Sequence, residues 1–289
     1  MHRAESFDDM SEEVFRYGEN NRGFGMVSLP ASLENAPVVV TFNAGLIHRE
    51  GPYRLNVLAC RALAEIGFIA IRIDLSGKGD TPAREGLSNR ESVALDWKYI
   101  KASINDRFGE RNLTLMGLCS GADNAIKITA EEKDVRGLIL LDPVSPADAD
   151  FHRRALKAKL TNIHKWLNLP ANMLRRFRRG MGWETDPYQH MASLRDAPTP
   201  QDARCCFTHI ASNNGRVLAV FTSHAVDRYN QEGQFVRAME IDGFDRCCEE
   251  VYWPCVEHIF PVQVHRDRLL AKIEDWARRQ FSVLNQRAG

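Results

Sequence analysis

The 289-residue sequence lacks several features that mark specialised classes of protein. No run of apolar residues approaches the roughly 18 to 20 that a membrane span needs. The opening segment MHRAESFDDMSEE is polar and acidic where a secretion signal would be apolar. The seven cysteines are an odd set with two adjacent pairs, which makes a poor disulfide framework. We therefore expect a cytoplasmic protein with reduced thiols and no membrane span.

The sequence also lacks an excess of charge of either sign, because 38 basic residues balance 38 acidic ones. There is no global electrostatic argument for binding nucleic acid or a membrane surface. The balance is uneven along the chain, since residues 148–195 hold ten Lys or Arg against four Asp or Glu. With 44% apolar and 26% charged residues, the composition is that of a globular chain, which excludes disordered and fibrous classes.

Motifs that bind nucleotides and metals are missing as well. No G-x-G-x-x-G is present after the first buried strand, and Gly77-Lys78-Gly79 lacks the length and the following Ser or Thr of a phosphate-binding loop. The cysteine pairs 205/206 and 247/248 lack C-x-x-C spacing, and adjacent residues of a strand point to opposite faces. We therefore expect neither a metal nor an organic cofactor.

Short β-branched runs alternate with longer segments of helical periodicity, a pattern typical of a parallel sheet flanked by helices. An antiparallel hairpin is expected first. The predicted strands are 14–17, 24–29, 37–43, 68–75, 112–118, 135–141, 217–222 and 247–253. The predicted helices are 53–66, 88–108, 120–132 and 264–284. Ser88 and Glu91 form a capping box at the start of the second helix.

Strand signals are missing between about residues 145 and 200, where helical patches carry the excess of positive charge. A chain of this length often forms one α/β core with an insertion. We therefore predict an α/β core made of residues 1–144 and 201–289, with a mostly parallel sheet of about eight strands. The insertion at 145–200 is predicted to be a helical cap.

The junction after the strand 112–118 reads Gly117-Leu118-Cys119-Ser120-Gly121. It has the pattern of a nucleophile elbow with Cys in place of Ser. Such an elbow needs small residues two positions before and after the nucleophile, because the helix passes close to the strand. The two glycines satisfy this rule for Cys119. A frame with Ser120 as nucleophile would put bulky Leu118 at one of the small positions.

An acid and a base follow the elbow in the chain order that this motif uses. Asp227 lies shortly after the strand 217–222, in the segment SHAVD. His258 lies after the last strand, in the segment PCVEH. The pattern therefore favours Cys119 as nucleophile, His258 as general base and Asp227 as the carboxylate that orients the base.

The segment from residue 37 to 81, PVVVTFNAGLIHREGPYRLNVLACRALAEIGFIAIRIDLSGKGDT, resembles the α/β-hydrolase superfamily. Within it, the segment is similar to serine-aminopeptidase-like hydrolases often encoded with bacterial exosortase and exopolysaccharide systems. GLCSGADNA, VFTSHAVDRYN and VEHIF extend the likeness over most of the chain outside the predicted cap. The resemblance implies a three-layer α/β-hydrolase fold. The cysteine in the elbow resembles that of dienelactone hydrolases.

The resemblance implies a catalytic triad of Cys119, His258 and Asp227. Asp142, which directly follows a predicted strand, is an alternative acid, because some lipases of this fold carry the acid there. Asp227 could instead cap a following helix. The chain has nine histidines, so His258 could be an ordinary loop histidine, and His224 also lies close to a proposed functional loop.

The resemblance also implies an oxyanion hole formed by the backbone NH groups of Ser120 and Leu46. The turn at residues 43–46 resembles the His-Gly turn of the family, with Asn-Ala-Gly in its place. Asp74 and Asp80, in the segment IDLSGKGD, are expected to stabilise a turn rather than to take part in chemistry.

A cysteine nucleophile favours a particular acyl chemistry. The pKa of a free thiol is about 8.5, and an adjacent imidazole and a helix N-terminus lower it, so the attacking species is a thiolate. We expect an enzyme that hydrolyses a small-molecule ester, thioester or lactone through a Cys119 acyl-enzyme. The alternatives are an acyltransferase that passes the acyl group to another acceptor and a non-catalytic binding protein on the same fold.

The basic charge of the predicted cap has two interpretations. A charge run is usually a solvated helical face. Alternatively, the cap could attract an anionic substrate or an acidic acyl-carrier partner by electrostatic steering. The residues in question are Arg153, Arg154, Lys157, Arg175, Arg176, Arg178 and Arg179.

Overall fold

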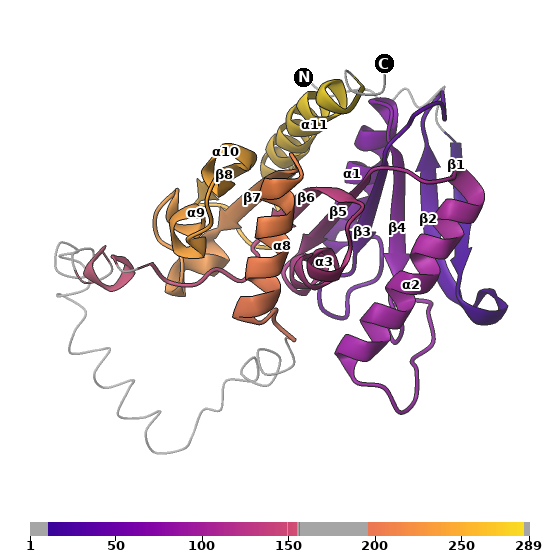
Figure 1. Ribbon diagram of the computed structural model, residues 1–289, viewed down its shortest axis with the longest axis horizontal. Coiled ribbons are helices and arrows are strands. Elements are labelled where there is room, and N and C mark those ends of the chain that lie inside the picture. Colours follow the sequence, from indigo (N-terminus) through magenta and orange to yellow (C-terminus); the bar gives the residue numbers. More distant parts are fainter. Residues whose placement is uncertain (1–10, 149, 155, 157–195, 286–289) are drawn as a thin grey trace.

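A sheet of eight strands in the order β1-β2-β4-β3-β5-β6-β7-β8 runs through a computed structural model that describes residues 11–148, 150–154, 156 and 196–285 (Figure 1). Its strands are β1 Ser11–Tyr17, β2 Gly23–Leu29, β3 Val38–Phe42, β4 Ile69–Asp74, β5 Leu113–Leu118, β6 Val135–Leu141, β7 Arg216–Thr222 and β8 Cys248–Trp253. β2 is antiparallel to both β1 and β4. All the other strands, β3 to β8, are parallel to one another. The predicted hairpin and mostly parallel sheet are therefore confirmed.

Helices cover both faces of the sheet, which makes three layers (Figure 1). One face packs against α1 Leu55–Glu65 and α11 Gln263–Asn285. The other packs against α2 Asn89–Phe108, α3 Ser120–Glu131 and α8 Pro200–Ser212. The short helices α9 Gln234–Met239 and α10 Phe244–Cys247 precede β8 in the chain.

The central strands are buried on both faces. In β3, Val38 and Val40 belong to one hydrophobic cluster and Val39 to the other, because successive side chains of a strand point to opposite faces. Complete burial of such a side chain stabilises the fold by about 1.5–3 kcal/mol. Burial on both faces explains why these segments are continuously apolar in the sequence rather than alternating.

The capping box predicted at the start of α2 is present. The Ser88 side chain accepts from the Glu91 NH, and the Glu91 carboxylate accepts from the Ser88 NH at 2.9 Å. A second box, Thr199 with Asp202, begins α8, a helix that the sequence analysis did not predict. Asp202 also accepts two hydrogen bonds from Arg90 of α2, at 2.7 and 2.9 Å. This contact holds the pKa of Asp202 well below its ordinary value and ties α8 to α2.

Most of the predicted cap at 145–200 falls on residues 157–195, which lie outside the described residues. Its helices therefore stay a prediction. None of the seven cysteines, all of which are among the described residues, forms a disulfide. In the part of the chain that the structure describes, no helix combines the length and the apolar character that crossing a membrane requires.

The edge hairpin is fastened to the sheet through Glu12 of β1. Its carboxylate accepts from Arg61 of α1 at 2.7 Å, and from Arg72 of β4 at 2.8 Å and Ser28 of β2 at 2.9 Å. Burial would raise the pKa of Glu12, but these hydrogen bonds outweigh it and lower the pKa to about 2. The carboxylate therefore stabilises the folded chain most above pH 4.5 and loses this effect as the pH falls through about 2.

Glu12→Gln is expected to lower the free energy of unfolding at pH 7 by about 2–3 kcal/mol, because it leaves Arg72 buried without its anionic partner. The deficit relative to wild type should shrink as the pH falls from 4.5 towards 2. Urea unfolding at several pH values measures both effects. Glu13→Gln is the matched control, since the half-exposed Glu13 pairs with Arg107 at the surface, and it should cost no more than about 0.5 kcal/mol. An equal loss of unfolding free energy in the two variants would contradict the role of Glu12 as the partner of buried Arg72.

Candidate active site

Cys119 lies at a strained turn between β5 and α3. Its φ of 55° and ψ of −118° are values that residues with a side chain rarely adopt. Two backbone hydrogen bonds hold the turn: the Cys119 NH donates to the Leu141 carbonyl at 2.8 Å, and the Asp123 NH donates to the Cys119 carbonyl at 3.1 Å. The half-buried cysteine therefore occupies a fixed position at the carboxyl edge of the sheet.

The two glycines that flank the elbow allow its close packing. A Cβ on Gly117 would lie 2.1 Å from the Gly121 carbonyl carbon. A Cβ on Gly121 would lie 2.9 Å from the Asn43 carbonyl oxygen and 3.0 Å from that of Phe42. These neighbours are backbone atoms, so they could not move aside without separating strand from helix. The steric requirement predicted around Cys119 is therefore present, and it brings the N-terminus of α3 against the end of β3.

His258 lies in the loop after β8 and contacts both a carboxylate and the thiol. Its Nδ1 donates to Asp142 Oδ2 at 2.6 Å, and the ring also hydrogen-bonds to Cys119. Asp142 is fully buried and accepts further hydrogen bonds from the Thr222 NH at 2.7 Å and the Thr222 hydroxyl at 2.5 Å. Because its carboxylate has several fixed donors, it can hold the imidazole in one orientation.

His258 contacts Asp142, which the sequence analysis named as the alternative acid, whereas its first choice was Asp227. The Nδ1 atom has one hydrogen, and Asp142 accepts it. The reason lies in the topology: the Asp142 NH donates to the Val220 carbonyl of β7 at 2.8 Å, which keeps the end of β6 in the sheet. Asp227 ends the short 3-10 helix Ser223–Asp227, and its side chain lies outside the described residues. The alternative acid noted from the sequence, Asp142, therefore contacts the imidazole.

The electrostatics of the site favour a charged pair. Burial lowers the pKa of His258, but hydrogen bonds to Asp142 and Cys119 outweigh it and raise the pKa to about 9. The imidazole is therefore protonated near neutral pH. A protonated imidazole beside a thiol favours the thiolate, which is the nucleophilic form of cysteine.

A second histidine completes the group. The ring of His224 stacks on that of His258, with centroids 4.0 Å apart and an interplanar angle of 25°. The sulfur of Cys119 and a nitrogen of each histidine lie within 4.8 Å of one another. Three such side chains could in principle hold a metal. However, the lone pairs of imidazole lie in the ring plane, so two stacked rings do not direct them to one point.

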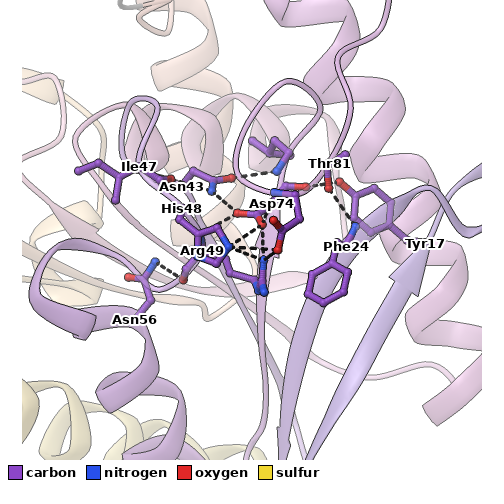
Figure 2. A network of polar contacts seen from close by, with 11 residues as sticks. Tyr17, Phe24, Asn43, Ile47, His48, Arg49, Asn56, Asp74 and Thr81 are labelled. Carbon is purple, nitrogen blue, oxygen red and sulfur yellow. Dashed lines mark hydrogen bonds and ion pairs between the residues drawn. The ribbon is translucent and has the colours of Figure 1, made fainter.

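The turn after β3, where the sequence analysis expected half of an oxyanion hole, is held by a network of polar contacts (Figure 2). The Ile47 NH donates to the Ala44 carbonyl at 2.9 Å. Asn43 Nδ2 donates to the Ile47 carbonyl at 2.9 Å and to Asp74 at 2.8 Å. Asn43 Oδ1 accepts from the Leu75 NH at 2.9 Å. The side chain of Asn43 therefore fastens the turn to the end of β4.

Figure 2 shows Asp74 at the centre of this network, with Arg49 beside it. The Arg49 guanidinium bridges Asp74 at 2.6 Å and Asp80 at 2.7 Å, and His48 approaches Asp80 at 3.3 Å. His48, Asp74 and Asp80 form the second group with metal-ligand spacing in the described chain. The Arg49 guanidinium already provides the positive charge that a metal ion would bring to these carboxylates. The expectation that Asp74 and Asp80 stabilise a turn agrees with these contacts, while Arg49 was missed because no sequence motif marks it.

Gly45 is the residue of the turn that contacts the elbow. Its NH donates to the Ser120 hydroxyl oxygen at 2.7 Å. The sequence analysis chose the Leu46 NH as the second donor of the oxyanion hole, in addition to the Ser120 NH. The Leu46 side chain is 75% exposed. Because Ser120 begins α3, its NH belongs to the first helical turn, whose NH groups have no partner within the helix.

Comparisons with known proteins concern the family and the fold of the chain. A family model described as serine aminopeptidase, S33, matches residues 38–212. An esterase of Pyrococcus furiosus is similar in structure, with a TM-score of 0.58, 14% identity, and coverage of 93% of this chain and 91% of that one. A dienelactone hydrolase from Anabaena variabilis gives a TM-score of 0.54, 12% identity and coverage of 93% and 97%.

A serine hydrolase from Xanthomonas campestris, described as having no lid, gives a TM-score of 0.53, 14% identity and coverage of 93% and 95%. No curated protein sequence matches the chain. At these identities the structural likeness concerns the fold alone. It confirms the predicted three-layer α/β-hydrolase fold.

The assignment of Asp142 predicts how the pKa of His258 responds to substitution. Asp142→Asn removes a contact that raises the pKa, while burial, which lowers it, remains. The contact with Cys119, which raises the pKa, also remains, so the pKa should fall from about 9 towards its ordinary value of 6.5. NMR titration of the imidazole nitrogens measures it, with Asp227→Asn as the matched control that should leave the value near 9. The reverse result would restore Asp227 as the partner.

Proposed function

The chain belongs to the serine aminopeptidase S33 family, and we propose that it is an acyl hydrolase with Cys119 as its nucleophile. The observation that carries the proposal is the series of contacts from Asp142 through His258 to Cys119 at a strained elbow. A buried carboxylate, an imidazole and a thiol in contact form the arrangement of a nucleophile–base–acid triad. Its substrates are small esters, thioesters or lactones.

In the first half of the reaction the Cys119 thiolate attacks the carbonyl carbon of the substrate. A carbon–sulfur bond forms, and the carbonyl π electrons move to oxygen. When this tetrahedral species collapses, the bond to the leaving oxygen or sulfur breaks, and the His258 imidazolium gives its proton to the leaving group. The products are a thioester on Cys119 and a neutral imidazole. Asp142 keeps Nδ1 occupied, so that Nε2 carries the proton that is transferred.

In the second half, water attacks the thioester and His258 takes a proton from it. The tetrahedral species collapses by breaking the carbon–sulfur bond, which releases a carboxylic acid and restores the thiolate beside an imidazolium. The same imidazole therefore acts as acid and then as base. The raised pKa of His258 suits the first role, because a protonated imidazole is ready before substrate arrives.

The choice of ester-like substrates over amides follows from the leaving groups. A thiolate is a better leaving group than an alkoxide or amide ion, so a tetrahedral intermediate on Cys119 returns to reactants unless the other group leaves easily. Esters, thioesters and lactones meet this condition better than amides do. The same reactivity of the thioester permits transfer of the acyl group to an alcohol, amine or thiol, and acyltransferase is the alternative that we retain.

Intact-mass measurement after brief exposure to p-nitrophenyl acetate and to acyl thioesters tests the proposal. Wild type should gain one acyl group, and Cys119→Ala should gain none and lose at least about a thousandfold in turnover. His258→Ala should be acylated far more slowly. Cys205→Ala and Cys255→Ala, which remove exposed thiols elsewhere, are the matched controls and should behave as wild type.

The decay of the adduct separates the two acyl chemistries. Decay that an added alcohol, amine or thiol accelerates, with capture of the acyl group, would make the chain an acyltransferase. Decay that depends on water alone would make it a hydrolase. Equal adduct formation and turnover in wild type and Cys119→Ala would overturn the cysteine mechanism. An unreactive wild type would leave the binding-protein alternative as the better explanation.

A further inference from the structure

The hydroxyl of Ser120 is a polar group at the elbow that the mechanism above does not use. The residue directly follows Cys119, begins α3 and is half-buried. Its oxygen accepts the Gly45 NH at 2.7 Å. Among the residues that the structure describes, the hydroxyl makes no second hydrogen bond. A serine hydroxyl has one donor proton besides its acceptor lone pairs, so the contact with Gly45 leaves that proton available.

A proton in this position is a better donor than that of an isolated hydroxyl. Successive hydrogen bonds polarise one another, so the NH dipole of Gly45 strengthens the hydroxyl as a donor to a further acceptor. The negative oxygen of a tetrahedral intermediate on Cys119 is an acceptor that arises next to Ser120. Donors fixed in advance at such an oxygen lower the barrier, because they need no reorganisation when the charge develops.

We propose that Ser120 supplies two donors to this oxyanion, its backbone NH and its side-chain hydroxyl, and that Gly45 acts through the hydroxyl. The inference rests on the proposed function. The hydroxyl donates a hydrogen bond and keeps its proton, so no bond to hydrogen is broken in this step. Leu46, the donor expected from the sequence, has no part in this arrangement.

The fold holds the hydroxyl and Gly45 in place from both sides. On one side, Gly121 lets the start of α3 pack against the carbonyls at the end of β3. On the other side, Asn43 fastens the turn through Asp74 and the Leu75 NH, independently of Ser120. The loss of the Ser120 hydroxyl would therefore leave the turn attached to β4.

Gly45 has a left-handed backbone conformation and few neighbours among the described residues. Its φ is +56°, and among the described residues, its two chain neighbours apart, no heavy atom lies within 4 Å of the position that a Cβ would take there. The glycine is therefore required by its backbone conformation rather than by a crowded neighbourhood.

Two electrophiles separate a donor to the oxyanion from a group that only supports the structure. Iodoacetamide alkylates a thiolate by displacement of iodide, and no carbonyl oxygen gains charge in that reaction. p-Nitrophenyl acetate acylates the thiolate through a tetrahedral intermediate with a negative oxygen. A residue that acts on the oxyanion changes the second rate and not the first, whereas damage to the elbow changes both.

Ser120→Ala should slow acylation of Cys119 by about 10- to 100-fold, somewhat less than is typical for a lost oxyanion donor, because the freed Gly45 NH compensates in part. Its rate of alkylation should stay within about twofold of wild type. Ser120→Thr, which keeps a hydroxyl, should be acylated within about threefold of the wild-type rate. Ser103→Ala on α2, away from the elbow, is the matched control and should change neither rate.

Several outcomes would overturn the inference. If Ser120→Ala is acylated as fast as wild type or faster, the hydroxyl is not a donor and only occupies the Gly45 NH. If alkylation and acylation fall together, or Ser120→Thr fails to restore acylation, the role is structural. A wild type that is alkylated but not acylated would overturn the proposed function as well, whereas normal acylation of both wild type and Ser120→Ala would overturn this inference alone.

Discussion

The close approach of β5, α3 and β3 at Gly117 and Gly121 is the constraint on which the site depends. Any side chain at either position would meet backbone atoms at 2.1 to 2.9 Å. Because strand and helix touch there, the chain between them must turn sharply, and Cys119 takes the strained conformation of that turn. The same contact brings the start of α3 beside the turn after β3. The proposed nucleophile and the proposed oxyanion donors are thus positioned by one packing requirement.

The charged groups of the site extend from the buried Asp142 through His258 to Cys119 at the edge of the sheet. Asp142 is fully buried, which would be costly without donors, and the backbone and hydroxyl of Thr222 supply two of them. The remaining capacity of the carboxylate is directed to His258. The imidazole then carries the positive charge towards Cys119, at the edge of the sheet. Burial of the acid and the proposed reactivity of the thiol are therefore parts of one electrostatic arrangement.

The sequence allowed the strands, the main helices and the elbow to be predicted, because each depends on residues that are close together in the chain. The identity of the acid was not decided by such a pattern. Asp142 and Asp227 both follow strands, and only the register between β6 and β7 brings Asp142 to the imidazole. The contact of Gly45 with Ser120 joins residues 75 positions apart, so no local spacing could indicate it. α8 was missed because its start coincides with the expected end of the cap.

The raised pKa of His258 connects the choice of cysteine to the whole site. An imidazolium that persists at neutral pH is a poor base for a serine hydroxyl, whose proton it would have to accept before attack. A thiol gives up its proton far more easily, so the same imidazolium can stand beside a thiolate before substrate binds. Replacement of the family's usual serine by Cys119 is therefore consistent with the electrostatics set by Asp142. The thiol itself contributes to the raised pKa of His258, so the charge of the imidazole depends on the residue at position 119 as well as on the buried acid.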